Sequence, residues 1–214
     1  MTWDDPGPED EGLKPEDLGP DDDDAEDGVA ASFRPMPGGA VAYFEPAQAG
    51  VVRSLVSQIA ELVSADSTAT EAAEAGTESN GLEAQLGLSS HVELPDDPVL
   101  ARLLPDGYSE DPEASAEFRR YTEETLRSGK ISSAQTVLAS LPASGGEVRL
   151  SEMECQQWLR ALNDVRLALS VRLGITDDNE DFSQHLAADD PRSAYIWVYQ
   201  WLAYLQDSLI EALT

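Results

Sequence analysis

The sequence predicts a mainly α-helical domain of about five helices, with a small N-terminal β-hairpin or edge strand and a disordered acidic tail before it. Three observations predict this fold class. Apolar residues recur at helical spacing in several segments, above all in residues 150–174. Two short apolar runs flank the turn residues 37–39. Carboxylates dominate residues 1–32, where apolar residues are too few to form a core.

The segment 150–174 is the clearest helix in the chain, because it carries a start signal, an apolar face and a stop signal. Ser151 and Glu154 fit a capping box, and Gly174 fits a left-handed helix end. The apolar face consists of Cys155, Trp158, Leu162, Val165, Leu169 and Leu173. We therefore expect this helix to be central to packing.

Arg166 falls inside that apolar face, and Asn163 lies along its edge. An unpaired buried charge costs several kcal/mol, so the sequence predicts an ion pair between Arg166 and a carboxylate of another helix. Glu117 and Asp207 are the candidates for this carboxylate. The candidates on this helix for structural or interaction roles are Trp158, Asn163, Arg166 and Arg172.

Composition limits the class of protein. With 214 residues and 41% hydrophobic content, the chain holds one domain plus tails. No run approaches the roughly 20 apolar residues that span a bilayer, and the first residues lack the basic and apolar regions of a signal peptide. Cys155 is the one cysteine, which excludes a disulfide within the chain. We expect a soluble cytoplasmic protein.

The net charge of −29 opposes binding to nucleic acid and to anionic membranes, because like charges repel. Residues 1–32 hold thirteen carboxylates against Lys14 and are predicted to be a disordered tail. Residues 65–94 are rich in Ala, Glu, Ser, Thr and Gly without a sustained apolar face, which predicts a flexible linker. The chain then divides into the tail 1–32 and a single helical domain 33–214 that carries this linker.

Further helices are expected at 46–63, 97–104, 113–128, 130–141 and 192–213. Gly129 is expected to break the chain between the third and fourth of these helices, and residues 144–146 to lead directly into the central helix. The side of helix 113–128 that is expected to face inward carries Phe118, Tyr121, Thr122, Thr125 and Leu126.

The last helix is apolar nearly all round in its middle, where Trp197, Trp201 and Tyr204 form one stripe. A helix that is apolar on every side is buried on every side, either by its own domain or by a partner. Both interpretations stay open: the stripe belongs to the core, or it contacts a protein partner or a second copy of the chain.

No catalytic or cofactor-binding motif is found. The two histidines, His91 and His185, lie in predicted loops, and no nucleotide-binding, zinc or nucleophile motif occurs. Residues 177–181 alternate like a calcium loop, but Phe182 occupies the position of the required glycine. We expect no metal, no cofactor and no enzymatic activity.

One stretch favours a nucleic-acid-binding function. Arg119, Arg120, Arg127 and Lys130 concentrate four of the thirteen basic residues, and residues 126–138 have the outline of a helix-turn-helix around Gly129. Two helices joined by a glycine turn are much commoner than DNA-binding motifs, and the net charge opposes DNA binding. DNA binding is therefore kept as an alternative.

The segments 97–108 (DPVLARLLPDGY), 117–120 (EFRR) and 158–174 (WLRALNDVRLALSVRLG) resemble the domain of unknown function family 2017 of high-GC Gram-positive bacteria. The resemblance covers the chain from about Phe33 onwards. It implies a small, mostly helical cytoplasmic protein without an assigned reaction, whose gene tends to lie beside that of ClpS, the adaptor of the Clp protease. Some members of this family are labelled transcriptional regulators.

These observations predict a non-enzymatic interaction or regulatory protein that binds a protein partner, with a possible link to Clp-dependent proteolysis through the family's gene neighbourhood. The first alternative is a transcriptional regulator that binds DNA through residues 126–138. An unrecognised hydrolase is the third. Sequence does not identify the partner or the oligomeric state.

Overall fold

The computed structural model describes residues 31–74, 95–108, 110–175, 190 and 192–214. These residues form five helices and a three-stranded antiparallel sheet near the N-terminus, which confirms the predicted fold class. They belong to one unit, from Ala31 to Thr214. The calcium-like loop, His91 and His185 lie outside the described residues, as do residues 1–30 and 75–94.

The sheet has the order β1-β2-β3, with β1 at Phe33–Met36, β2 at Gly39–Phe44 and β3 at Gly146–Ser151. Pro37 and Gly38 form the β1–β2 turn, and Gly38 and Gly39 have positive φ. A Cβ on Gly39 would lie 1.8 Å from the carbonyl oxygen of Leu150, so only glycine fits there.

Strand β3 is not among the elements predicted from the sequence, in which residues 144–146 lead directly into the central helix. The signal was present, since Val148 and Leu150 are buried and alternate with exposed residues. Pairing with β2 places Val148 opposite Ala42 and Leu150 opposite Ala40. The hairpin that was predicted is therefore completed by a strand about 100 residues further along the chain.

Helix α1, at Pro46–Glu74, is longer than expected. The prediction that it ends near Val63 and that a linker begins at residue 65 is wrong for residues 65–74. Those residues have no sustained apolar face, yet several of them favour helix, and a helix already nucleated by its packed first part propagates at little cost.

Helix α3, at Pro98–Leu103, begins at Asp97, whose side chain accepts hydrogen bonds from the backbone N–H groups of Val99 and Leu100. Helix α4, at Pro112–Ser140, is continuous, so the predicted break at Gly129 is wrong. A glycine inside a helix costs only about 1 kcal/mol relative to alanine, and the apolar residues that follow it, such as Ala134 and Val137, are buried.

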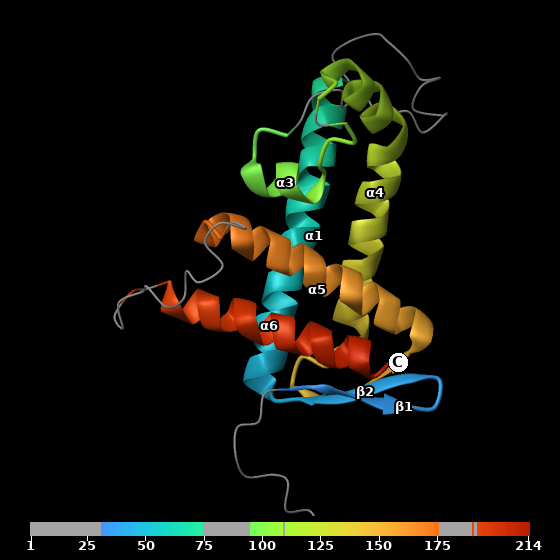
Figure 1. Cartoon of the computed structure of the whole chain (residues 1–214), viewed down its shortest axis with the longest axis vertical. Helices are drawn as coiled ribbons and strands as arrows, with labels where there is room; N and C mark the ends of the chain where they lie inside the picture. Colours follow the sequence, from blue (N-terminus) through green and yellow to red (C-terminus); the bar gives the residue numbers. More distant parts are fainter. Residues whose placement is uncertain (1–30, 75–94, 109, 176–189, 191) are drawn as a thin grey trace, which may run out of the picture. The chain divides into compact units, whose positions relative to one another are not determined.

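Helix α5, at Glu152–Leu173, packs against α1, α3, α4, α6 and the sheet, as Figure 1 shows. The predicted capping box of Ser151 and Glu154 and the left-handed end at Gly174 are both confirmed. Trp158 is fully buried against the rings of Phe33 and Phe44, and its Nε1 donates to Ser140 Oγ at 2.9 Å. This tryptophan joins the sheet to α4 and α5.

Helix α6, at Ser193–Glu211, is buried on one face only. Trp201, Leu202, Leu205 and Leu209 are buried there, and Ser208 Oγ accepts a hydrogen bond from the backbone N–H of Phe33 in β1. The other face carries exposed apolar side chains: Tyr195, Trp197, Tyr204 and Ile210. The described part of the chain therefore does not bury the second face, and burial of that face by a partner stays a prediction.

Candidate interaction surface

The first half of α4 has its apolar and charged faces in the opposite places from those expected. Phe118, Tyr121 and Leu126, which were predicted to face inward, are exposed by 46%, 59% and 41%. The buried positions of this half are instead polar or charged: Ser115, Arg119, Glu123 and Arg127. These four residues are spaced four apart, so they lie in one row along the helix.

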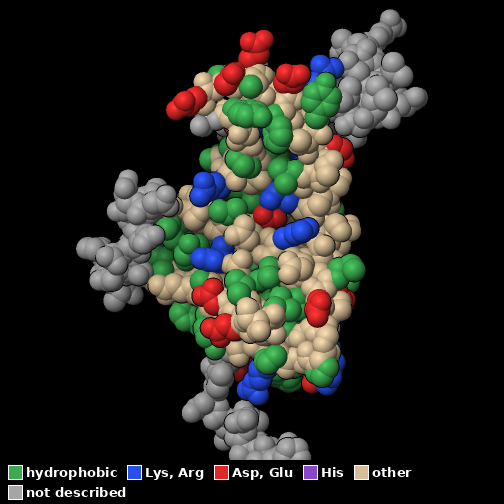
Figure 2. Space-filling model, turned by 45° about the vertical axis from the view of Figure 1, so that its right-hand side comes forward, with side chains coloured by type: hydrophobic (Ala, Val, Ile, Leu, Met, Phe, Trp, Pro, Cys, Tyr) green, Lys and Arg blue, Asp and Glu red, His purple; other side chains and the backbone are tan. Residues whose placement is uncertain are grey.

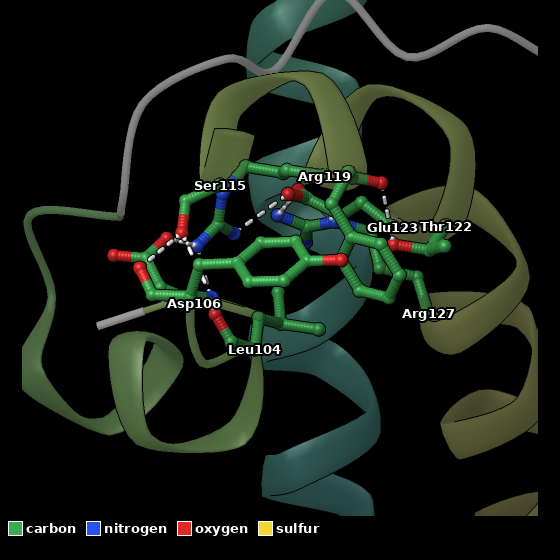
Figure 3. Close-up of polar contacts among 9 residues, drawn as sticks. Leu104, Asp106, Ser115, Arg119, Thr122, Glu123 and Arg127 are labelled. Carbon is green, nitrogen blue, oxygen red and sulfur yellow. Dashed lines mark hydrogen bonds and ion pairs between the residues drawn. The ribbon is translucent and has the colours of Figure 1, made fainter. Parts of the chain in front are cut away.

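The buried charges form a connected network, which Figure 3 shows in close-up and which we call the α4 charge ladder (Asp106, Arg119, Glu123, Arg127). Glu123 accepts from Arg119 Nη1 at 2.8 Å through one carboxylate oxygen, and from Arg127 Nη2 at 2.7 Å through the other. Arg119 Nη2 also donates to Asp106 Oδ1 at 2.7 Å. One carboxylate therefore holds two arginines on the same helix face.

Backbone carbonyls of neighbouring elements complete the ladder. Arg127 Nη1 donates to the carbonyl of Val63 in α1, and Arg119 Nη2 donates to the carbonyl of Leu104, which follows α3. Burial lowers the pKa of Arg119, but hydrogen bonds to Glu123 and Asp106 outweigh it and the net pKa is raised. Arg119 is thus held in its charged form, and the ladder ties α4 to α1 and to the end of α3.

Because the ladder occupies the inner face, the aromatic residues of α4 face outward and line a groove of about 790 Å³ between α4 and α5. We call it the α4–α5 groove. On α4 it is lined by Phe118, Tyr121, Thr122, Thr125, Leu126, Gly129, Lys130 and Ser133, and on α5 by Arg160, Asn163 and Asp164. Figure 2 looks onto this side and shows hydrophobic side chains gathered along the upper part of α4, with basic and acidic side chains below them.

The end of the groove nearest α5 is polar. Lys130 Nζ donates to Asp164 Oδ1 at 2.6 Å, and both side chains are mostly buried. Burial raises the pKa of the Asp164 carboxyl, although the Lys130 ammonium opposes that shift. Arg160 lies beside this pair, is exposed, and makes no hydrogen bond or ion pair with the residues that the structure describes.

The predicted DNA-binding cluster does not form a basic surface. Arg119 and Arg127 are buried in the charge ladder, and Lys130 is paired with Asp164. Arg120 lies on the same helix, half-buried. Because α4 continues through Gly129, residues 126–138 are not a helix-turn-helix, and that structural prediction is wrong.

The sequence profile of the DUF2017 family, described as a domain of unknown function, matches residues 30–213. The chain belongs to the DUF2017 family. Its sequence is 37% identical over 146 residues to a putative oxidative stress regulator AosR of Mycobacterium leprae, and the match covers 62% of this chain and 66% of that protein. It is 36% identical over 149 residues to the oxidative stress regulator AosR of Mycobacterium tuberculosis strain H37Rv, covering 63% and 67%.

The chain thus spans about two thirds of the length of these curated relatives. No solved structure matches the chain. These relatives are named as regulators. The family resemblance inferred from the residues is therefore confirmed, while the implied gene neighbourhood beside ClpS stays a prediction.

In this DUF2017 chain, Arg166 has different partners from those predicted. Its Nη1 donates to Gln206 Oε1 at 2.7 Å, and its guanidinium lies 5.3 Å from the centre of the Tyr199 ring. No carboxylate among the described residues pairs with it, so the expected ion pair with Glu117 or Asp207 is wrong. Arg166 is half-buried, so water reaches part of its guanidinium and a carboxylate is not required, although its Nε is buried without a hydrogen-bond partner among the described residues.

The other predicted interaction residues fall in different places. Trp158 and Trp201 are buried, whereas Asn163 lines the α4–α5 groove and Arg172 is exposed at the end of α5. Trp197 stacks on Trp201 with ring centres 6.1 Å apart and is exposed by 61%. Tyr204, on the same helix, is exposed by 51%. The structure therefore brings Asn163 to the groove and leaves the α6 aromatics on a separate surface.

Chemical groups for catalysis are scarce in the described part of this family member. Cys155 is buried, and burial raises the pKa of its thiol, so it packs as a small apolar group. Within the described ranges, no three His, Cys, Asp or Glu side chains gather to hold a metal ion. The helices described there also include none that is long and apolar enough to cross a membrane.

Proposed function

We propose that this DUF2017 chain is a non-enzymatic regulatory protein that acts by binding a protein partner through the α4–α5 groove. The observation that carries the proposal is the reversed burial of α4, in which charges are buried and aromatic side chains are exposed. Burying a charged row is expensive unless its groups are paired, as they are here. An arrangement of this kind supports a role for the outward apolar face, because exposed apolar patches on soluble proteins mark interaction sites.

The names of the relatives support a regulatory role in the response to oxidative stress. Direct sensing by a thiol in this chain is not supported, because Cys155 is buried and is the one cysteine in the sequence. We therefore place the regulatory step in the binding of a partner. The link to Clp-dependent proteolysis, which rests on the family's gene neighbourhood, is kept as a proposal about the identity of that partner.

A gene deletion in the source organism tests the proposal. The deletion strain is challenged with hydrogen peroxide and complemented with wild type or with the double variant Tyr121→Ser and Leu126→Ser. Both side chains are exposed, so the variant should fold with wild-type stability within about 0.5 kcal/mol. We expect wild type to restore survival and the double variant not to.

The matched control changes the same chemistry on α6, as Tyr204→Ser and Ile210→Ser, where both residues are exposed. This pair also tests the second candidate, a homodimer or partner contact through the exposed α6 aromatics, which is favoured by the exposure of Trp197 and Tyr204. Loss of complementation by the α6 pair alone would make α6 the contact surface. Full complementation by both pairs would contradict binding through either surface.

A further inference from the structure

The α4–α5 groove has an apolar floor with a definite length and direction. Phe118 and Tyr121 lie three residues apart on α4, as Leu126 and Gly129 do. Thr122 and Thr125 lie between the two pairs at helical spacing, so these lining residues form one stripe. The stripe covers about three turns, or about 17 Å. A partner helix laid along it would meet apolar side chains over a similar number of turns, with the bulky rings at one end.

Gly129 lies at the other end of this stripe, where no side chain covers the backbone of α4. A Cβ built on Gly129 would meet no atom within 4 Å, so space lies directly over the backbone there. The missing side chain lets another backbone approach α4 closely. An α-helix is the partner element that fits this site best, because amphipathic helices bind apolar grooves through residues spaced three and four apart.

The charges of the groove are unlike those of the rest of the chain. The one carboxylate in its lining, Asp164, is already paired with Lys130, and the guanidinium of Arg160 has no partner among the described residues. The lining therefore carries a net positive charge in a chain whose net charge is −29. A second copy of the chain would be repelled at long range, whereas one carboxylate on a partner would meet Arg160.

We propose that the α4–α5 groove binds an amphipathic helix of another protein, and that Arg160 binds a carboxylate at one end of the apolar face of that helix. This inference rests on the proposed function and adds the chemistry of the partner. The partner's apolar residues would cover Tyr121 and Leu126, and its backbone would pass over Gly129. The carboxylate end would point toward α5, where Arg160 lies.

A displayed library of helical sequences of about 15 residues, enough for four turns, tests this chemistry. The library varies the apolar positions and places acidic, basic or neutral residues at either end. It is selected on the full purified chain and counter-selected on Gly129→Leu, which fills the open space. We expect the survivors to carry apolar residues three and four apart and Asp or Glu at one end.

The surviving sequences are then measured as free peptides against single variants of the full chain. Gly129→Leu should weaken binding at least tenfold, about the loss of a central apolar contact, while Gln135→Leu, an exposed position outside the groove, should change it less than about twofold. Arg160→Ala should weaken binding by about two- to fivefold, as expected for an exposed ion pair. Arg172→Ala, which removes the same charge elsewhere on α5, should have less effect.

Several results would overturn the inference. Survivors with basic ends, survivors that bind Gly129→Leu equally well, or an empty selection would each exclude an acidic amphipathic helix as the occupant. Self-association of the chain in sedimentation, lost in Gly129→Leu, would make a second copy the occupant instead. If these results occur while the Tyr121 and Leu126 double variant still fails in cells, the proposed function stands without this partner chemistry.

Discussion

Glu123 is the residue on which the exposure of the α4 aromatics depends. It is 2% exposed and bonds both Arg119 and Arg127, which are also buried. Each arginine has other partners, namely Asp106 and the Leu104 carbonyl for Arg119 and the Val63 carbonyl for Arg127. Glu123 bonds both arginines, so the connection between them is lost when its charge is removed.

Glu123→Gln should therefore destabilise the fold by about 3–5 kcal/mol, the usual cost of breaking a buried ion pair from one side. The measurement is the urea midpoint of unfolding, with Glu124→Gln as control because Glu124 is the next residue and is exposed. The control should differ from wild type by less than about 0.5 kcal/mol. Equal midpoints for Glu123→Gln and wild type would show that the ladder adds little to stability.

Glu154 gives a second prediction at this scale, which concerns pH. Hydrogen bonds from the hydroxyl and the backbone N–H of Ser151 lower the pKa of the Glu154 carboxyl below its ordinary value. A carboxyl with a lowered folded-state pKa contributes stability above its ordinary pKa, and this contribution is lost as pH falls through the lowered value. The stability advantage of wild type over Glu154→Gln should therefore shrink as pH falls through the carboxyl range.

Denaturant unfolding at neutral pH and at acid pH measures this difference. Glu152→Gln is the control, because Glu152 lies in the same first turn and shares the helix dipole but makes no side-chain hydrogen bond among the described residues. A wild-type advantage over Glu154→Gln that stays constant with pH would argue against the carboxylate form of the capping box.

At the scale of elements, the sequence signals that concern a single helix succeeded and those that concern packing did not. The caps of α5 were predictable because a capping box and a glycine stop act within a few residues. The faces of α4 were not, because apolar Phe118 and Tyr121 looked like core residues and Arg119 and Arg127 looked like surface residues. Only the spacing of Arg119, Glu123 and Arg127 four apart could have indicated a buried row.

The candidate site was missed for the same reason. A groove exists only where α4 and α5 meet, and the sequence gives no register between two helices. Asn163 was a candidate from its position at the edge of the α5 apolar face, and the structure does bring it to the groove. Arg160 was not a candidate, because its role depends on the ion pair between Lys130 and Asp164, which leaves Arg160 as the cation facing the groove.

Gly129 provides the test of the continuous α4. Glycine in a helix interior costs about 0.5–1 kcal/mol relative to alanine, and an added Cβ at this position would meet nothing within 4 Å. Gly129→Ala should therefore raise stability by about that amount, measured by denaturant unfolding. A loss of stability would instead favour the helix break at Gly129 that was predicted from the sequence.

The control for this prediction is Gly39→Ala, which should be strongly destabilising. Its backbone has positive φ, and the new Cβ would overlap the carbonyl of Leu150. The two substitutions add the same methyl group, so the opposite signs depend on the backbone and its neighbours alone.

At the scale of the whole molecule, the distribution of charge separates the regulatory proposals. The acidic segment 1–32 contributes −12 of the net −29, and its effect on any anionic ligand is repulsive. Of the four basic residues once considered for DNA, three are engaged with carboxylates in the charge ladder or with Asp164. This cluster is therefore not a patch of free cations that could displace counterions from DNA phosphates.

We therefore predict no sequence-specific DNA complex at physiological salt, either for the full chain or for a chain lacking residues 1–30. Removing those residues changes the net charge from −29 to −17, so the shortened chain is the one more favourable to DNA. DNA affinity rises as salt falls, with a slope of about −0.9 per phosphate contacted, because binding releases counterions. The measurement is a titration of labelled promoter fragments against both chains at several salt concentrations. Tight, sequence-selective binding by either chain, weakened by Arg120→Ala but not by Arg172→Ala, would contradict regulation through a protein partner alone and would place α4 on DNA.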